Sequence, residues 1–227
     1  MLDFREMSIA GDDGATLHAW IHDGTTLPIL LLHDLGMDAT YWERFLEAAL
    51  LRVPTLAVAA LDLRGHGGSE TGSETSRKRM VKDLRKWVGL LGIDPPIVVG
   101  HGYGADIALA SDFVAAVIAV NPSLGREAPP VPSDLQLPVS MTGAQDAEVL
   151  RMCTVGAMQA KPLRRGRRDA PLFLIVSDPE DLDHPGLPGL REVCEDMQIW
   201  KSGSRHLPLE VPAGVAALVL EWIEEVR

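Results

Sequence analysis

The sequence predicts an α/β domain in which a mostly parallel central sheet is covered by helices on both faces. Short apolar runs of strand length alternate along the chain with segments of helical periodicity, which is typical of a parallel sheet with crossover helices. The strand runs are continuously apolar, as expected for strands that are buried on both faces. The composition agrees, because 46% of the 227 residues are hydrophobic, which is enough for a sizeable core.

The first part of the chain predicts four strands and one helix. Residues 4–22 form two short strands around an Asp-Asp-Gly hairpin signal. The apolar runs at 28–32 and 55–61 are two further strands, buried in the sheet. Between them, residues 39–51 place their apolar side chains at helical spacing.

The middle of the chain continues the alternation. A polar, Gly-rich loop extends to about Ser76, and residues 77–91 then form a helix with one apolar stripe. A buried strand at 97–99 precedes a helix at 103–111. The next strand is expected at 114–120.

The last part predicts two more strands, at 171–176 and 197–200, and a closing amphipathic helix at 212–226. The length suits a single domain over residues 1–227. The segment 122–170 interrupts the alternation and predicts a short, lid-like insert.

The insert is rich in proline, then helical over about 144–160, and it ends in a basic run over 161–168. The basic run predicts a solvated surface loop. A site for an acidic partner or a phosphate group is the alternative. A lid this short suggests a small or open cover over the site.

Charge and cysteine content limit the partners. There are 21 Lys and Arg residues against 32 Asp and Glu residues, giving a formal net charge of −11. A chain this acidic repels nucleic acid and anionic membranes, so we expect neither as a partner. The two cysteines, Cys153 and Cys194, suit neither a disulfide framework nor a zinc site and favour a reduced, cytoplasmic setting.

Two features of the sequence argue against export and membrane insertion. The charged start of the chain is not expected to be a signal peptide. The most apolar stretch, 97–120, contains His101, Asp106 and interior glycines, so it predicts buried core rather than a membrane span. The sequence indicates no oligomeric state.

Four segments carry the motifs, in a fixed order. They are LLLHDLGMDATYW (30–42), LDLRGHGGSE (61–70), VVGHGYGADIAL (98–109) and GSRHLPLEVP (203–212). Their order and spacing resemble the α/β-hydrolase fold superfamily over nearly the whole chain. The second segment is specific, since residues 62–69 match the D-x-R-G-H-G-x-S turn of that superfamily.

The resemblance implies a nucleophilic serine in the middle of a G-x-S-x-G turn between a strand and a helix. The five residues at this place are Gly100 to Gly104, and the nucleophile position is Gly102. The flanking glycines that permit the tight turn are kept. Glycine has no side chain, however, and cannot form an acyl-enzyme.

The resemblance also implies a catalytic histidine and an acid. His206 lies in a segment similar to the histidine loop before the last helix, and we expect it to face the site. The acid is expected in the loop after the strand at 171–176. Asp181 fits the family pattern and is preferred, while Glu180 fits the distance from the strand end.

The oxyanion hole of the superfamily uses two backbone N–H groups. The matching donors here are those of Leu35 and Tyr103, and the family glycine after His33 is replaced by Asp34. The Asp34 carboxylate either lies near the hole and opposes a developing oxyanion, or points away and caps the following helix. NDRG-type proteins, which keep the fold without hydrolysis, resemble this chain in their His-Asp pair and their elbow glycine.

Further candidates surround this site. His33, Trp42, His101 and Tyr103 are expected to bind substrate, although the Tyr103 side chain has packing as its alternative. Ser123 and Cys153 are possible replacement nucleophiles, but neither lies in a supporting motif. No metal cluster, dinucleotide fingerprint or phosphate loop is present in the sequence, so we expect no cofactor.

These residues leave three functional hypotheses. The first is a catalytically inactive homologue that acts as a ligand-binding or interaction protein. The second, slightly favoured, is a non-covalent enzyme in which His206 is the general base, oriented by Asp181 and with Asp34 as a second acid/base group. Its reaction would be elimination, cyclisation, isomerisation or water-mediated hydrolysis of a small carbonyl or ester-like substrate. The third is an esterase-type hydrolase whose nucleophile was replaced.

Overall fold

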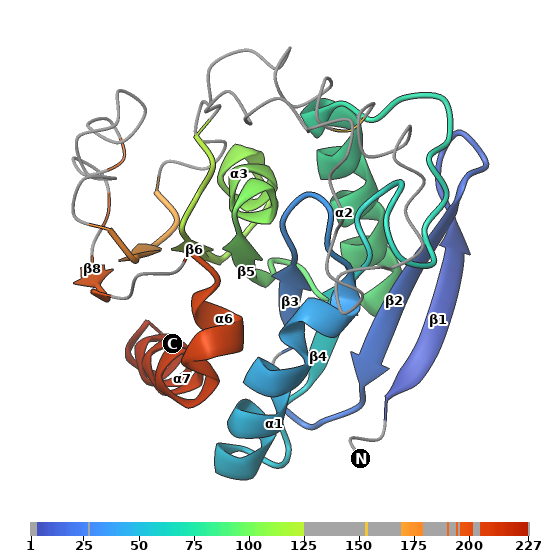
Figure 1. Cartoon of the computed structure of the whole chain (residues 1–227). Coiled ribbons are helices and arrows are strands. Elements are labelled where there is room, and N and C mark those ends of the chain that lie inside the picture. The colour runs from blue at the N-terminus through green and yellow to red at the C-terminus, as the bar shows by residue number, and fades with distance from the viewer. Residues whose placement is uncertain are drawn as a thin grey trace.

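The described part of the chain forms one sheet of eight strands, in the order β1-β2-β4-β3-β5-β6-β7-β8 (Figure 1). The computed structural model describes residues 4–26, 28–124, 153, 169–178, 190, 194, 196–201 and 205–226. The strands are β1 (Arg5–Ala10), β2 (Thr16–His22), β3 (Ile29–Leu32), β4 (Val58–Leu61), β5 (Ile97–His101), β6 (Ala116–Val120), β7 (Leu172–Val176) and β8 (Asp196–Ile199). Among these described strands, the pairs β1–β2 and β2–β4 are antiparallel and the other pairs are parallel. The predicted mostly parallel sheet is confirmed.

Helices cover both faces of this sheet, as the alternation predicts. The helical elements are η1 (Ala39–Trp42), α1 (Glu43–Arg52), α2 (Arg77–Leu91), α3 (Tyr103–Ala110), α6 (Leu207–Glu210) and α7 (Pro212–Glu225). Helices α1 and α7 pack into one hydrophobic cluster, and α2 and α3 pack into the other, so that the two pairs lie on opposite faces (Figure 1).

Burial on both faces explains the apolar composition of the central strands. Along β3, Leu30 and Leu32 contribute to the cluster under α2 and α3, whereas Ile29 and Leu31 contribute to the cluster under α1 and α7. Successive side chains of a strand point to opposite faces. Because both faces are buried here, every position of the strand must be apolar.

Some predicted boundaries differ from the structure for local reasons. The helix predicted at 39–51 begins as the 3₁₀ turn η1, where the Asp38 side chain accepts the Thr40 N–H, and continues as α1. Strand β4 begins at Val58 rather than at residue 55, since the Thr55 carbonyl accepts hydrogen bonds from the turn at Thr25 and Thr26. Most of the predicted insert 122–170 lies outside the described residues.

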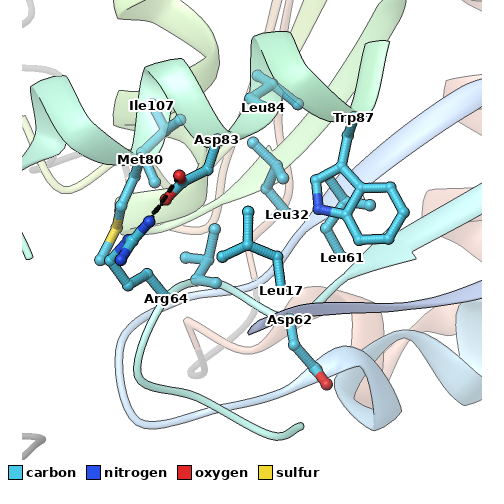
Figure 2. Close-up of a pocket in the computed structure, with 11 residues that line it drawn as sticks. Leu17, Leu32, Leu61, Asp62, Arg64, Met80, Asp83, Leu84, Trp87 and Ile107 are labelled. Atoms are coloured by element: carbon cyan, nitrogen blue, oxygen red, sulfur yellow. Dashed lines mark hydrogen bonds and ion pairs between the residues drawn. The ribbon is translucent and has the colours of Figure 1, made fainter. Parts of the chain in front are cut away.

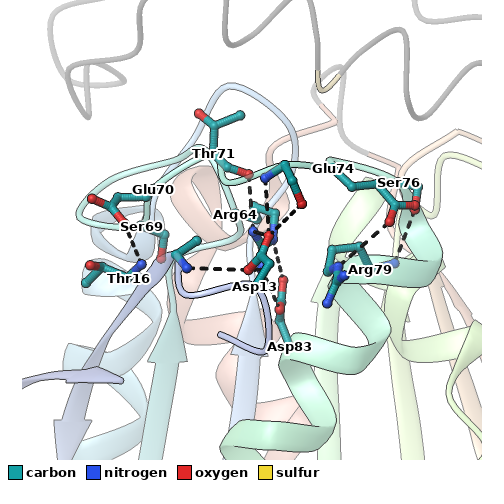
Figure 3. A network of polar contacts seen from close by, with 12 residues as sticks. Asp13, Thr16, Arg64, Ser69, Glu70, Thr71, Glu74, Ser76, Arg79 and Asp83 are labelled. Carbon is teal, nitrogen blue, oxygen red and sulfur yellow. Dashed lines mark hydrogen bonds and ion pairs between the residues drawn. The ribbon is translucent and has the colours of Figure 1, made fainter. Parts of the chain in front are cut away.

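A buried ion network joins three segments: the β1–β2 hairpin, the motif turn at residues 62–69, and α2 (Figure 3). The Arg64 guanidinium donates to both carboxylate oxygens of Asp83 at 2.8 Å, and to both of Asp13 at 2.8 and 3.1 Å. Its side chain is fully buried. The hydrogen bonds from Arg64 lower the pKa of the Asp13 carboxyl well below its ordinary value. One cation thus ties three segments together.

The interior under α2 leaves little space beside this network. Figure 2 shows a cavity between α2 and the sheet, with apolar side chains around it and the Arg64–Asp83 ion pair at one end. Its volume of about 10 Å³ is at the lower limit for a single water molecule. This cavity is therefore too small for an organic ligand.

Removal of the Arg64 charge should destabilise the fold strongly. In Arg64→Met, the Asp13 and Asp83 carboxylates lose their shared cation and stay close together in the interior. We expect the free energy of unfolding, measured by urea denaturation, to fall by about 3–5 kcal/mol. The control is Arg5→Met, which breaks the exposed pair of Arg5 with Asp23 and should change stability little. Equal effects of the two variants would contradict the network's structural role.

Candidate active site

The polar residues of the site lie at the carboxyl ends of neighbouring parallel strands. His33 and Asp34 follow β3, Gly102 follows β5, and Asn121 follows β6. Strands β3, β5 and β6 are adjacent and parallel, so their ends meet at one edge of the sheet. In open α/β sheets, this edge is where ligands bind.

The turn between β5 and α3 has the sharp geometry that the sequence predicts. Gly102 has φ 54° and ψ −119°, a conformation that strongly favours glycine. Gly104 follows in the first turn of α3, where a Cβ atom would lie 2.4 Å from the Leu32 carbonyl oxygen. The strand, turn and helix of a nucleophile elbow are therefore present, and the side chain at its tip is missing.

The carboxylate of Asp34 occupies the space at this tip. Its Oδ1 atom accepts the Leu35 N–H at 2.8 Å and the Tyr103 N–H at 2.7 Å. These are the two donors predicted for the oxyanion hole. A Cβ atom built on Gly102 would lie 2.0 Å from the Asp34 Cγ atom. The Asp34 side chain therefore points toward these two N–H groups rather than away from them.

The other oxygen of this carboxylate is differently placed. Within the described part of the chain, Oδ2 of Asp34 makes no hydrogen bond, and the residue is partly exposed. The carboxylate is thus held by one oxygen and presents the second. This arrangement suits a reactive group better than a fully satisfied ion pair.

Hydrogen bonds of two buried histidines join the Asp34 loop to the motif turn after β4. His33 donates from Nδ1 to the Asp34 carbonyl at 2.7 Å and accepts the Leu63 N–H on Nε2 at 2.9 Å. His66 donates from Nδ1 to the Arg64 carbonyl and accepts the Gly36 N–H on Nε2 at 3.0 Å. Each ring therefore uses both nitrogens on backbone groups and must be neutral.

Burial gives these two histidines unusual acid–base properties. Both rings are fully buried, which lowers the pKa of His33 well below 6.5 and also lowers the pKa of His66. The nearby His66 ring further lowers the pKa of His33. His33, predicted to bind substrate, is instead placed in the interior as a structural support of the loop.

The histidine loop is attached to two strand ends through one carbonyl group. The Arg205 carbonyl accepts from His101 Nε2 at 2.8 Å and from Asn121 Nδ2 at 2.7 Å. Asn121 has a positive φ of 42° and also accepts the Ser177 N–H. His206 follows directly and is the N-cap residue of α6. These bonds fix the position of the predicted base, and Asn121 is a supporting residue that sequence reasoning missed.

Aromatic stacking completes the wall of the site. The Tyr41 ring stacks on His101 with centroids 4.9 Å apart, and it lies edge-on to His206 at 6.3 Å. Burial lowers the pKa of His101, an effect that the charge of Asp34 opposes and the His206 ring reinforces. Tyr41 was also missed by sequence reasoning, although it precedes Trp42 in the same predicted helix.

The Tyr41 hydroxyl is buried and has no hydrogen-bond partner in the described part of the chain. Burial first, and then the charge of Asp34, raise the pKa of this hydroxyl. Tyr41 also lines a hollow of about 340 Å³ with Met37, Arg44 and Leu209. This volume is within the range of small-molecule sites.

The other predicted site residues lie either in the core or outside the described part of the chain. Trp42 is fully buried and packs on Phe45 in the core under α1. The Tyr103 ring joins the opposite cluster, under α2, so it lies in the core while its N–H faces the site. Asp181 and Glu180 lie outside the described residues.

The two replacement nucleophiles are also placed. Cys153 is fully buried, and burial raises the pKa of its thiol to about 11, which disfavours the reactive thiolate. The Ser123 N–H donates to the Gly102 carbonyl, so this residue lies beside the elbow. No described residue accepts a hydrogen bond from the Ser123 hydroxyl.

The described residues form neither a metal-binding cluster nor a membrane-spanning helix. Among the described side chains, no group of three or more His, Cys, Asp and Glu residues is arranged to hold a metal ion. The helices in this part of the chain are all too short or too polar to cross a membrane. Chemically, the arrangement offers a carboxylate, a histidine and a buried phenol, without a serine at position 102.

Comparison with known proteins agrees with the observed α/β fold. A family model described as alpha/beta hydrolase family matches residues 29–218. The chain is 27% identical over 204 residues to lipase LipV of Mycobacterium tuberculosis, a match that covers 88% of this chain and 67% of the lipase. It is also 32% identical over 125 residues to protein phosphatase methylesterase 1 of Bos taurus.

Coverage differs between these relatives. The methylesterase match covers 51% of this chain and only 33% of the methylesterase, so the chain spans about a third of that protein. Among solved structures, the bottromycin epimerase BotH has a TM-score of 0.73 at 22% identity, covering 94% of this chain and 98% of its own. At this identity the similarity shows the fold alone.

The two buried histidines predict an acid-sensitive fold. Each ring stays neutral in the folded protein but is protonated in the unfolded chain below pH 6.5, so stability is full above that pH and declines below it. We expect urea denaturation to show a loss of up to about 1.4 kcal/mol per pH unit for each ring. Proton NMR should find that the His33 and His66 rings titrate below the ordinary histidine value of 6.5. Titration of either ring near pH 6.5 would contradict this assignment.

Proposed function

The chain belongs to the alpha/beta hydrolase family, and from this premise we propose that it is a member without serine chemistry. In this proposal the Asp34 carboxylate takes the place of the serine side chain, and His206 is the general base. The substrate is a small molecule. The observation that carries the proposal is the pair of hydrogen bonds from Leu35 and Tyr103 to Oδ1 of Asp34.

Two features of this geometry oppose serine-type acyl transfer. Gly102 offers no nucleophile, and the two N–H donors that would stabilise an oxyanion on the substrate are already bonded. An enolate or oxyanion on the substrate would have to displace a carboxylate tethered beside the donors. The same geometry therefore disfavours those non-covalent reactions that depend on a free oxyanion hole.

Proton transfer and water activation fit the arrangement better. The half-bonded Asp34 carboxylate and His206 are two groups able to accept protons at one strand edge, and the loop bonds described above fix both. The solved structure of an epimerase on the same fold supports the general idea, because epimerisation is a proton transfer that needs no acyl-enzyme. Asp181 remains our proposed orienting acid for His206.

A second function has its own observation. Because Oδ1 of Asp34 satisfies both donors, the site is complete without substrate, as expected for a homologue that only binds a ligand or partner. The third hypothesis, an esterase with a replaced serine, has less support. A serine at position 102 would collide with Asp34, so the two replacements form a coupled pair.

Restoring an esterase should require changes at both positions. In Gly102→Ser the new side chain meets the Asp34 carboxylate and the donors stay occupied, and in Asp34→Gly the nucleophile is still missing. We expect neither single variant to hydrolyse p-nitrophenyl acetate above the native rate. The double variant should exceed both by about 100-fold, the usual effect of an oxyanion-hole donor.

The single variants control for each other in this assay. Circular dichroism and urea denaturation would first establish that all three variants fold. If Gly102→Ser alone were as active as the double variant, Asp34 would not block the site and the proposal would fail at its central contact.

Native activity should depend on Asp34 and His206. A panel of small esters, lactones, epoxides and carbonyl compounds would be followed by NMR for any turnover. We expect Asp34→Asn and His206→Gln each to reduce that turnover at least about 100-fold, the lower range for a general acid or base. Asp112→Asn, which changes an exposed carboxylate paired with Arg85 away from this site, should retain it. Binding of a panel compound without turnover would favour the ligand-binding alternative.

A further inference from the structure

We propose that the hollow between η1, α1 and α6 is a second binding site, and that its ligand is a small neutral carboxamide. The side chains that matter to its chemistry are Met37, Asp38, Tyr41, Glu43, Arg44 and Leu209, and its volume is about 340 Å³. Neither Asp34, Gly102 nor His206 is among the described residues that line it. The proposal therefore does not depend on the reaction proposed for the strand ends.

The hydroxyl of Tyr41 is the first indication of a ligand. The residue is only 5% exposed, and its hydroxyl has no hydrogen-bond partner in the described part of the chain. A buried hydroxyl that makes no hydrogen bond is costly. A ligand atom in the hollow that Tyr41 lines would remove this cost.

The protonation of Tyr41 determines which ligand atom faces it. Burial raises the pKa of the hydroxyl, and the charges of Asp34 and Glu210 raise it further. The hydroxyl therefore keeps its proton and acts as a donor. Its partner must be an acceptor, such as a carbonyl oxygen.

Two carboxylates on the same hollow are acceptors. Oδ1 of the half-buried Asp38 accepts the Thr40 N–H at 2.9 Å, whereas its Oδ2 receives no hydrogen bond from the described residues. Glu43 is exposed at the start of α1, and no described group donates to its carboxylate. The ligand should therefore carry N–H groups in addition to its carbonyl oxygen.

Arg44 joins the two sides of the hollow. Its Nη1 atom donates to the Leu209 carbonyl at 3.4 Å, which links α1 to α6. A guanidinium has five N–H groups, so others remain for the carbonyl oxygen of a ligand. Met37 and Leu209 supply apolar contacts for a short hydrocarbon group.

Charge distinguishes a carboxamide from its ionic analogues. A carboxylate ligand would meet Asp38 and Glu43 on a chain whose net charge is −11. An alkylammonium ligand would meet Arg44 and would leave the Tyr41 hydroxyl without an acceptor. A carboxamide offers a carbonyl oxygen and N–H groups without a net charge, so it matches every polar group named here.

Tyr41 also connects the hollow to the candidate active site. Its ring stacks on His101 with centroids 4.9 Å apart and lies edge-on to His206 at 6.3 Å (centroid distance). A ligand that binds the Tyr41 hydroxyl therefore changes the surroundings of His206 without touching it. Binding can be followed from both rings.

The test is an NMR titration of the full chain with four probes of similar size: butanamide, butanoate, butylammonium and methyl propanoate. The chain has two tyrosines, so ¹³C-labelling of tyrosine rings gives separate signals for Tyr41 and Tyr103. We expect butanamide to shift the Tyr41 and His206 ring signals, with a millimolar dissociation constant suited to its size. The Tyr103 ring, in the opposite hydrophobic cluster, should not respond.

Variants locate the binding. Tyr41→Phe keeps the ring and should weaken butanamide binding, measured on the His206 signals, by roughly 5- to 10-fold, as for a lost hydrogen bond. Leu209→Trp should fill the hollow and abolish binding. Arg44→Gln should weaken it, whereas Arg52→Gln, a matched change in α1 at the exposed pair with Glu221, should not.

Each other outcome would overturn the proposal. If none of the probes shifted the Tyr41 signals, the hollow would not be a binding site. If butanoate or butylammonium bound as tightly as butanamide, a neutral ligand would be the wrong class. If methyl propanoate did so, the N–H contacts would be wrong.

Asp34→Asn separates this proposal from the proposed function. The variant should lose turnover of the panel compounds and still bind butanamide, because Asp34 does not line the hollow. Loss of butanamide binding in Asp34→Asn would show that the probe occupies the candidate active site instead. Retained turnover with retained binding would overturn the proposed function alone.

Discussion

The position of the Asp34 carboxylate is the constraint on which the whole site depends. One oxygen joins a donor from the loop after β3 to a donor from the start of α3, two segments that are far apart in sequence. The bond is possible only because Gly102 has no Cβ atom, which would lie within 2.0 Å of the carboxylate. The aspartate and the glycine are therefore a single structural change, and neither replacement can be interpreted without the other.

Buried polar groups in the neighbouring motif turn hold the Asp34 loop in place. Asp62 accepts the Ala39 N–H, while His33 and His66 join the same loop to the motif turn through their ring nitrogens. Arg64 then fastens that turn to the hairpin and to α2. Burial of such groups is costly unless their hydrogen bonds are made. The specific motif at 62–69 is thus explained by packing, since its side chains support the site without entering it.

Much of this could be predicted from the sequence, and the exceptions have physical causes. Continuous apolar runs revealed the buried strands, and the spacing of glycines revealed the elbow, because both features follow from local geometry. The direction of the Asp34 side chain could not be predicted, since it depends on the Tyr103 N–H, which reaches the site only in the folded sheet. Tyr41 was missed because a buried tyrosine in an apolar stripe resembles core until its hydroxyl is seen without a partner.

The hydrogen bonds that Leu35 and Tyr103 donate to Asp34 limit the chemistry that the proposed site can support. A substrate oxyanion would have to compete for the two donors with a carboxylate that is attached to the same loop, and such tethered groups act at effective concentrations far above those of free ligands. Reactions that place negative charge on the substrate carbonyl are therefore disfavoured.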